Sequence, residues 1–215
     1  MLVAARTAAW AKSGSPTPAS YGGLCFAAEA DNSSVQLTAV GSAPAVTLIK
    51  SFDGVNWEDY SVGEVIELPS IGDFVYLAAG EGGNETFGSS LSNYHKFVIN
   101  GLVAASGDIT SLRRFDLIQT PFANFCYNSM FSGCTGLTSA PELPATTLAT
   151  DCYNSMFGRC THLSLIKVNF TAWEGKTNGW VSGVASTGTF YKPTALTEEY
   201  GTSEIPTGWT VVNIE

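Results

Sequence analysis

Charge is scarce in this sequence. Only 13% of the 215 residues are Asp, Glu, Lys or Arg, about half the share usual in soluble proteins. The surface must therefore be covered largely by Ser, Thr, Asn and Gly, as is common on extracellular and viral assemblies. Basic residues are the scarcest, because 10 Lys and Arg stand against 19 Asp and Glu, a net charge of −9. Nucleic acids and anionic membranes both need a basic surface. The only basic pair is Arg113–Arg114, so we expect neither partner.

Long apolar runs are also missing. None approaches the roughly 18 residues of a membrane-spanning helix, so we expect no membrane insertion. Residues 1–15 resemble a secretion signal at first, but Arg6 and Lys12 interrupt the apolar stretch. Fewer than the roughly seven consecutive apolar residues of such a signal remain.

The same N-terminal segment fits another role. Leu2, Val3 and Trp10 are apolar, and a Gly/Ser/Pro-rich tether follows at 13–18. We interpret residues 1–20 as an arm and linker that anchor the protein to a larger assembly by burying these three side chains. The alternative is a frayed terminus without a role.

Motifs for metals and cofactors are missing as well. None of the five cysteines forms a C-x-x-C pair, which argues against a zinc or redox site. No calcium-loop motif surrounds Asp31 or Asp53, and the glycine-rich stretch 80–83 lacks the Lys-Ser/Thr of a phosphate-binding loop. We expect no cofactor and no metal.

What the sequence does contain is an internal repeat. CYNSMFSGCTGL at 126–137 and CYNSMFGRCTHL at 152–163 lie 26 residues apart and agree at nine of twelve positions. Such self-similarity predicts units that stack on one another. Apolar residues recur every four positions, which predicts a helix, and a short strand is expected at 137–140. The expected repeat core consists of Cys126, Met130, Phe131, Cys134, Leu137, Cys152, Met156, Phe157, Cys160 and Leu163.

The motif resembles the BspA-like branch of the leucine-rich repeats, found in surface proteins of gut bacteria and their phages. The pattern CYxxMFxGCTxLTxAPELPATTLA of that branch is present at 126–149, and the resemblance covers about 45 residues, 122–168. The second copy departs from it, because LSLIKVNF at 163–170 replaces the proline-rich half. The resemblance implies a solenoid and a surface role.

A solenoid usually needs at least about three repeats to bury its core. Two copies therefore need neighbours at both ends. We expect a partial first coil at 107–112 and a closing cap at 171–215, in which Trp180 and Trp209 pack internally.

The first half shows strand signals about every ten residues, with a hairpin dipeptide at Asp53–Gly54. This rhythm predicts a small antiparallel sandwich. The expected fold is β-rich, α+β, with a sandwich packed directly on a short solenoid. The expected units are an arm and linker at 1–20, a β-sandwich-like domain at 21–107, the solenoid at 108–170 and the cap at 171–215.

Catalytic chemistry finds little support. His95 stands beside a predicted strand, His162 occupies a variable repeat position, and neither has a GxSxG-type partner. Glycoside hydrolysis would need two carboxylates facing each other across a cleft. The candidates fit solvated surface better: Glu58, Asp59, Glu64, Glu67, Glu198 and Glu199. The repeat cysteines are expected to be buried, reduced thiols, since free Cys packs as a small hydrophobe.

Aromatic side chains are the best candidates for contact with a sugar or a protein partner. These are Trp57, Tyr60, Trp173 and Tyr191; the alternative is that they pack in the core.

The leading functional hypothesis is a non-enzymatic phage virion protein, either a decoration or a fibre-associated component. It would be oligomeric, bound to other virion proteins, and would contact a bacterial surface protein or glycan. The alternatives are an adhesin at the bacterial cell surface or outside the cell and, further off, a glycan-active enzyme.

Overall fold

The computed structural model describes residues 23–113, 122–173 and 175–215. These residues form thirteen strands and a single 3₁₀ turn, η2 (Ile109–Leu112), whose first residues are capped by the Asp108 side chain. The β-rich prediction is therefore confirmed, whereas Leu2, Val3 and Trp10 of the expected anchor lie outside the described residues. The strands are β1 (Cys25–Ala28), β2 (Ser33–Val40), β3 (Leu48–Ser51), β4 (Glu58–Tyr60), β5 (Val65–Leu68), β6 (Phe74–Ala79), β7 (Gly88–Ser90), β8 (Asn93–Asn100), β9 (Val103–Ser106), β10 (Leu137–Ser139), β11 (Leu165–Lys167), β12 (Thr189–Pro193) and β13 (Thr210–Ile214).

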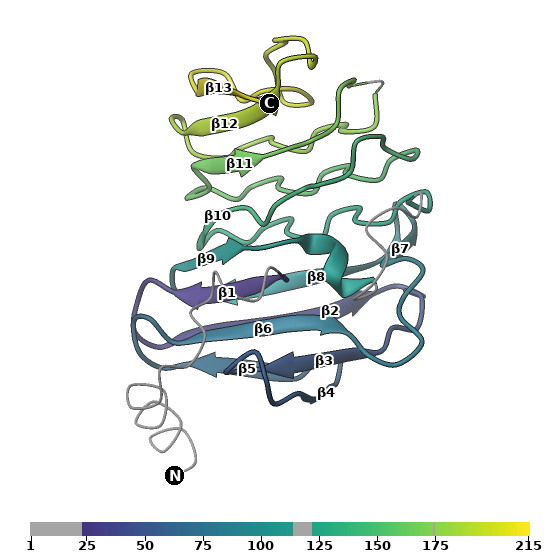
Figure 1. Ribbon diagram of the computed structural model, residues 1–215, viewed down its shortest axis with the longest axis vertical. Helices are drawn as coiled ribbons and strands as arrows, with labels where there is room; N and C mark the ends of the chain where they lie inside the picture. Colours follow the sequence, from purple (N-terminus) through teal and green to yellow (C-terminus); the bar gives the residue numbers. More distant parts are fainter. Residues whose placement is uncertain (1–22, 114–121, 174) are drawn as a thin grey trace.

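The strands form two sheets. The larger is mixed and has nine strands in the order β13-β12-β11-β10-β9-β1-β6-β3-β4. The smaller has four antiparallel strands in the order β5-β2-β8-β7. Figure 1 shows the parallel strands stacked along the long axis, with β13 at one end and β3 and β4 at the other. No helix among the described residues is long and apolar enough to cross a membrane.

One apolar core joins the two sheets. It extends from Leu24 to Trp209. Phe26 of β1 meets Phe97 of β8 with ring centroids 4.8 Å apart, and Phe97 stacks on Phe131 of the first repeat at 5.1 Å. The antiparallel half and the repeats therefore bury their side chains together.

Strand β9 is the point where the sheet changes character. It pairs antiparallel with β1 on one side and parallel with β10 on the other. The expected boundary between residues 107 and 108 falls directly after this strand. The two halves are consequently continuous in one sheet.

The predicted helix in each repeat is wrong. Residues 125–133 form successive turns in which every second amide bonds within its own turn. The amides between them reach the next repeat, as when the Tyr127 N–H donates to the Cys152 carbonyl at 3.0 Å. An α-helix would keep all of these bonds inside one segment. Every fourth residue is left-handed, with φ of 59° at Phe125, 56° at Ser129 and 82° at Gly133. The buried side chains thus recur every four residues, close to the 3.6 of an α-helix, because the backbone forms consecutive tight turns.

The turns continue beyond the two copies that the sequence marks. Segment 176–184 stacks on the second copy: the Phe157 N–H donates to the Trp180 carbonyl at 2.8 Å and the Arg159 N–H to the Ser182 carbonyl at 2.7 Å. The left-handed positions recur here at Gly175, Gly179 and Gly183. Residues 171–215 were expected to form a closing cap. They add a third segment that stacks like the two repeat copies, and two parallel strands, β12 and β13.

The number of residues between paired positions on neighbouring parallel strands decreases along the stack. Ser139 pairs with Leu165, 26 residues on; Leu165 with Thr189, 24 on; and Thr189 with Thr210, 21 on. The later turns lack the CYNSMF letters and the regular spacing, which is why the sequence comparison misses them.

A close approach explains one difference between the copies. Gly136 occupies the position that His162 fills in the second copy. A Cβ at Gly136 would lie 1.8 Å from the Gly101 carbonyl oxygen, so no side chain fits where the first repeat meets the β8–β9 turn. The His162 side chain is exposed instead, and its Nδ1 lies 2.6 Å from the Thr135 carbonyl oxygen.

Candidate functional site

The candidate site is a groove of about 510 Å³ at one end of the space between the two sheets. The groove is wide open to solvent, unlike the concave clefts that bury most of a small ligand. Strands β2 and β8 supply Ala39 and His95, β3 and β4 supply the middle of the lining, and the loops after β2 and β4 supply the rest. The lining residues are Ala39, Ala43, Pro44, Ala45, Val46, Thr47, Leu48, Asp59, Tyr60, Ser61, Val62 and His95.

The groove lies where the inward-facing side chains of β2 cease to be covered. Along β2, Val35 and Leu37 are fully buried between the sheets, but Ala39 on the same face is exposed. Strand side chains alternate between faces, so Ala39 is directed inward without being covered. Its β8 partner, His95, is only 3% exposed and forms the adjoining wall.

His95 is held in one orientation. Its Nδ1 lies 3.2 Å from the Phe87 carbonyl oxygen, which can only accept, so Nδ1 carries the proton. The Phe87 ring meets the imidazole edge-on at 5.9 Å. Burial lowers the pKa of His95 from its ordinary 6.5, against a smaller opposing effect of the bond to Phe87. A pKa below 6.5 leaves the ring uncharged at neutral pH.

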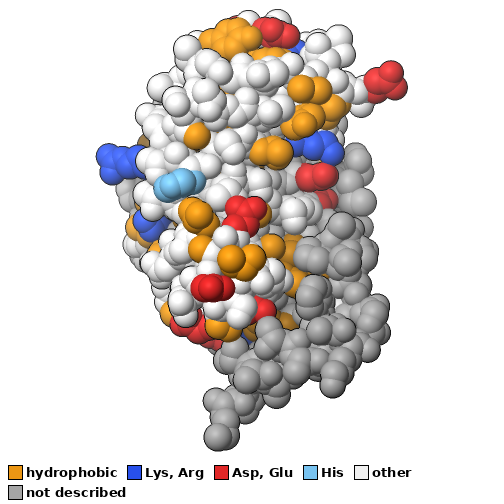
Figure 2. Space-filling view, turned by 90° about the vertical axis from the view of Figure 1, so that its left-hand side faces the viewer, with side chains coloured by type: hydrophobic (Ala, Val, Ile, Leu, Met, Phe, Trp, Pro, Cys, Tyr) orange, Lys and Arg blue, Asp and Glu red, His pale blue; other side chains and the backbone are white. Residues whose placement is uncertain are grey.

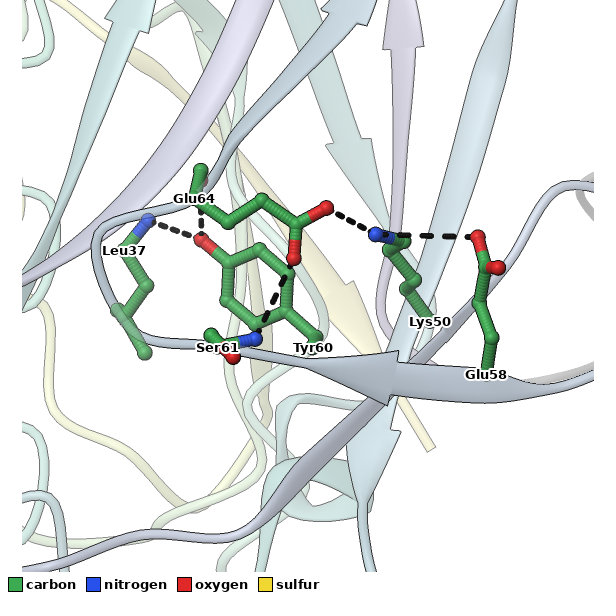
Figure 3. Close-up of polar contacts among 6 residues, drawn as sticks. All are labelled: Leu37, Lys50, Glu58, Tyr60, Ser61 and Glu64. Carbon is green, nitrogen blue, oxygen red and sulfur yellow. Dashed lines mark hydrogen bonds and ion pairs between the residues drawn. The ribbon is translucent and has the colours of Figure 1, made fainter.

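A polar latch beside the groove ties the two sheets together (Figure 3). The Tyr60 hydroxyl accepts a hydrogen bond from the Leu37 N–H at 2.7 Å and donates to the Glu64 carbonyl at 2.9 Å. The nearly buried Lys50 ammonium pairs with Glu64 and lies 3.7 Å from Glu58. Tyr60 and Lys50 belong to the large sheet, whereas Leu37 belongs to the small one. The bond from the Leu37 N–H to the Tyr60 hydroxyl therefore connects the two sheets.

Replacing Tyr60 by phenylalanine should destabilise the protein by about 1–3 kcal/mol, because the Leu37 N–H would be left buried without its acceptor. Urea unfolding followed by circular dichroism measures the change. Tyr200→Phe is the matched control, since that ring is 52% exposed. Equal stability of Tyr60→Phe and the wild type would show that the latch contributes nothing.

Glu64 gives the latch a pH dependence. Partial burial opposes its ionisation, but hydrogen bonds from Lys50 and from the Ser61 N–H outweigh this and lower the pKa of Glu64 below its ordinary 4.5. A lowered pKa adds stability that is complete above pH 4.5 and is lost as the pH falls through the folded-state pKa. Because the Glu64 side chain is 37% exposed, we expect at most about 1 kcal/mol.

The check is the free energy of unfolding of Glu64→Gln between pH 7 and pH 3. The variant should be less stable than the wild type at pH 7 and should converge with it near pH 3. The exposed Glu67→Gln serves as control. A constant difference across this range would contradict the assignment.

The structure argues against a ligand-binding role for most of the aromatic candidates. Tyr60 is 5% exposed and Trp173 is 7% exposed; the Trp173 indole N–H donates to the Thr197 carbonyl at 3.1 Å. Neither presents a free ring face. Trp57 is half-buried against the Cys25–Phe74–Tyr76 cluster. Tyr191 is half-exposed on β12, paired between Lys167 and Val212. The four do not meet at one site.

The residues expected in the repeat core lie there. All ten have exposures of 0–1%, and equivalent rings stack from turn to turn: Phe131 on Phe157 at 5.5 Å and Tyr127 on Tyr153 at 6.2 Å. Trp180 and Trp209 also pack internally, as predicted, with exposures of 0% and 5%.

All five cysteines are buried free thiols in the structure. Burial raises the pKa of Cys126 to about 11 and that of Cys25 and Cys134 to about 12, against weaker opposing effects of nearby groups. The Cys134 thiol donates to the Phe97 carbonyl at 3.1 Å and the Cys160 thiol to the Phe131 carbonyl at 3.0 Å. Their repetition is explained by packing and by these bonds, which join Cys134 to β8 and Cys160 to the first copy of the repeat.

Iodoacetamide at pH 8 should leave the folded protein almost unlabelled, because the reactive thiolate is both shielded and scarce. Under non-reducing denaturing conditions all five cysteines should react. Intact mass spectrometry counts the labels. A denatured protein that takes up a single label would contain two disulfides and would contradict the prediction.

The remaining titratable groups do not converge. Among residues 23–113, 122–173 and 175–215, no group of three or more His, Cys, Asp or Glu side chains could hold a metal ion. The Asp53 carboxylate closes its own turn with bonds from the Val55 and Asn56 amides. Slight burial opposes its ionisation, but these bonds lower the pKa of Asp53 to about 2.

Sequence reasoning missed the groove. Tyr60 was singled out, but as an exposed stacking residue, and His95 only as a lone histidine. Nothing in the local pattern shows that Ala39 and His95 lie side by side at an opening between two sheets. No protein-family model, curated protein or solved structure matches this chain.

Proposed function

We propose that this chain is a non-catalytic structural and adhesive module of a surface, with a bacteriophage virion as its setting. The expected solenoid at 108–170, of which residues 108–113 and 122–170 are described, is then continued by residues 175–184, and residues 23–107 form a sandwich-like head. The observation that carries the proposal is the nine-stranded sheet together with one hydrophobic core that extends from Leu24 to Trp209. Continuous stacking of this kind suits a stiff spacer that holds one end away from the other.

The surface chemistry supports the same role. On the described part of the face in Figure 2, charged side chains are few and scattered among backbone, uncharged polar and hydrophobic side chains. The buried thiols have raised pKa values, which suits packing better than nucleophilic chemistry. We propose oligomerisation with further copies or with other virion proteins as the means of attachment.

The test is immunoelectron microscopy of phage particles with an antibody against the chain, together with binding of the fluorescent protein to intact host bacteria. Regular labelling of particles and saturable binding to cells are the expected results. Labelling of the bacterial envelope in uninfected cells would favour a cell-surface adhesin. Hydrolysis of a host polysaccharide by the purified protein, measured as released reducing sugar, would overturn the non-catalytic assignment.

A further inference from the structure

Strand β13 forms an outer edge of the nine-stranded sheet, at one end of the long axis in Figure 1. On one side it pairs in parallel with β12 along its whole length, and there the Thr210 N–H donates to the Gly188 carbonyl at 2.9 Å. Successive residues of a strand turn their amide groups to opposite sides, so those of Val211 and Asn213 point away from β12. Among the described residues no strand pairs with β13 on that side.

The other three free edges of the two described sheets each carry a feature that discourages further pairing. β4 carries the exposed side chains of Glu58 and Asp59, and β5 carries the exposed Glu67. β7 has only three residues, and its pairing with β8 is irregular. Charges, short strands and irregular pairing are common ways in which proteins keep sheet edges from associating. β13 has none of these features, because its five residues are uncharged and its register with β12 is continuous.

We propose that β13 pairs antiparallel with β13 of a second copy of this chain, so that two nine-stranded sheets become one. Val212 then lies on the two-fold axis, opposite Val212 of the second copy. Val211 exchanges backbone hydrogen bonds with Asn213 of the second copy, and the outward amide groups of both residues gain partners. The inference deepens the proposed function by giving its oligomerisation a surface, and it rests on that proposal only for its setting in a virion.

The side chains of β13 fit this pairing. Val211 packs against the core, so Thr210, Val212 and Ile214 lie on the opposite face of the sheet. Directly opposite residues share a face, so Val212 meets its own copy and Thr210 meets Ile214 of the second copy. Val212 and Ile214 are half-buried in the single chain, and β-branched side chains pack well on a pleated surface. The paired segment brings no like charges together.

A head-to-tail arrangement, with β13 against β4 of another copy, is the competing way to cover this edge. Such a contact is heterologous and builds open filaments. β4 would bring Glu58 and Asp59 to the contact, and β13 has no Lys or Arg to balance them. The symmetric pairing avoids these carboxylates and closes at two copies.

Acidic side chains near β13 decide the conditions of the measurement. Glu198 and Glu199 are exposed in the loop between β12 and β13, and the dimer brings two such loops to the same end. Repulsion between exposed charges is largely screened beyond roughly 8 Å at physiological ionic strength. The association is therefore measured at that ionic strength.

The first experiment is sedimentation velocity of the full chain over a range of micromolar concentrations. We expect a reversible equilibrium between monomer and dimer, without larger species. A monomer at every concentration would overturn the proposal. Filaments that lengthen with concentration would overturn it in favour of pairing between β13 and β4.

Substitutions in β13 test whether this edge forms the dimer. Asn213→Pro removes an outward N–H, as an edge strand tolerates, and should weaken the dimer at least about tenfold, whereas Asn213→Ala keeps the N–H and should not. Val212→Lys places two like charges on the axis and should give monomers, and mixing it with Val212→Glu should restore a mixed dimer. Asp59→Lys, on β4, is the control. Thermal melts establish that each variant is folded, and a folded Asn213→Pro that dimerises like the wild type would contradict the proposal.

A cysteine on the axis tests the register. Val212→Cys should form an intermolecular disulfide under mild oxidation, because opposite residues at such a position have Cα atoms roughly 4.5 Å apart, within reach of a disulfide. Thr210→Cys should not, since the two copies of that residue would lie roughly 13 Å apart along the strands. The five native cysteines are buried, so non-reducing electrophoresis reports the introduced thiol. Equal crosslinking of both variants would overturn the register.

Failure of this inference is distinguishable from failure of the proposed function. A dimer through β13 without labelling of phage particles would leave the interface standing and remove the virion setting. Regular labelling of particles by a chain that sediments only as a monomer would do the reverse.

Discussion

Replacing Trp180 by alanine is expected to destabilise the protein by about 3–5 kcal/mol, the cost typical of truncating a large buried aromatic. Among the described residues, Trp180 is the largest side chain that is fully buried. Its ring is stacked on Tyr153 at 6.5 Å and meets Phe190 edge-on at 6.1 Å. Its indole N–H donates to the Glu204 carbonyl at 2.8 Å. The substitution therefore leaves a cavity and removes the hydrogen bond to the Glu204 carbonyl, which lies between β12 and β13.

Chemical unfolding measures this loss, and hydrogen exchange of the β12 and β13 amides locates it. Relative to the wild type, Trp180→Ala should speed the exchange of those amides more than that of the amides of β2 and β8. Tyr200→Ala is the control, because its exposed ring should cost less than about 0.5 kcal/mol. If Trp180→Ala unfolds at the wild-type urea concentration, residues 176–184 are not a core turn of the stack.

Met130→Ala is expected to cost about 2–5 kcal/mol. The side chain is fully buried, and Met156 occupies the equivalent place in the next turn with the same exposure of 0%. The Met130 carbonyl also accepts the Phe97 N–H of β8 at 2.7 Å, so this position lies where the repeats meet the small sheet. Loss of side-chain volume there loosens the contact between the two halves.

A thermal melt of Met130→Ala beside Met156→Ala checks the equivalence, and both should shift the midpoint downward. Leu165→Ala, at a position 38% exposed, should shift it little. A Met130→Ala midpoint equal to that of the wild type would exclude the proposed core position.

The repeat shows how a correct pattern led to a wrong element. The buried positions Cys126, Met130 and Cys134 were predicted correctly from their period of four. The helix was wrong because a period of four is shared by two backbones. In one, every amide bonds four residues back; in the other, alternate amides bond to a neighbouring turn. Side-chain periodicity reports which face is buried and does not report where the amides find their acceptors.

The first half shows the same division. Strands about every ten residues were predicted for this half, and β2, β6 and β8 are among the strands that the structure forms there. Their partners were not predictable from these patterns. β6 pairs with β1 and β3, while β2 pairs with β5 and β8. Which strands pair depends on contacts between segments far apart in the chain, because the two sheets share one core.

The sequence by itself determined the β-rich composition, the 26-residue repeat, the ten residues of its core and the sparse charge of the surface. Each of these depends on residue type and spacing along the chain. Only the tertiary structure decided the continuous nine-stranded sheet, the third turn at 176–184 and the groove at Ala39 and His95. These depend on contacts between segments far apart in the chain, such as the Gly101 carbonyl that excludes a side chain at Gly136. Backbone hydrogen bonds between neighbouring turns accept many side-chain sequences, so a turn can stack on its neighbour after its sequence has lost all resemblance to it.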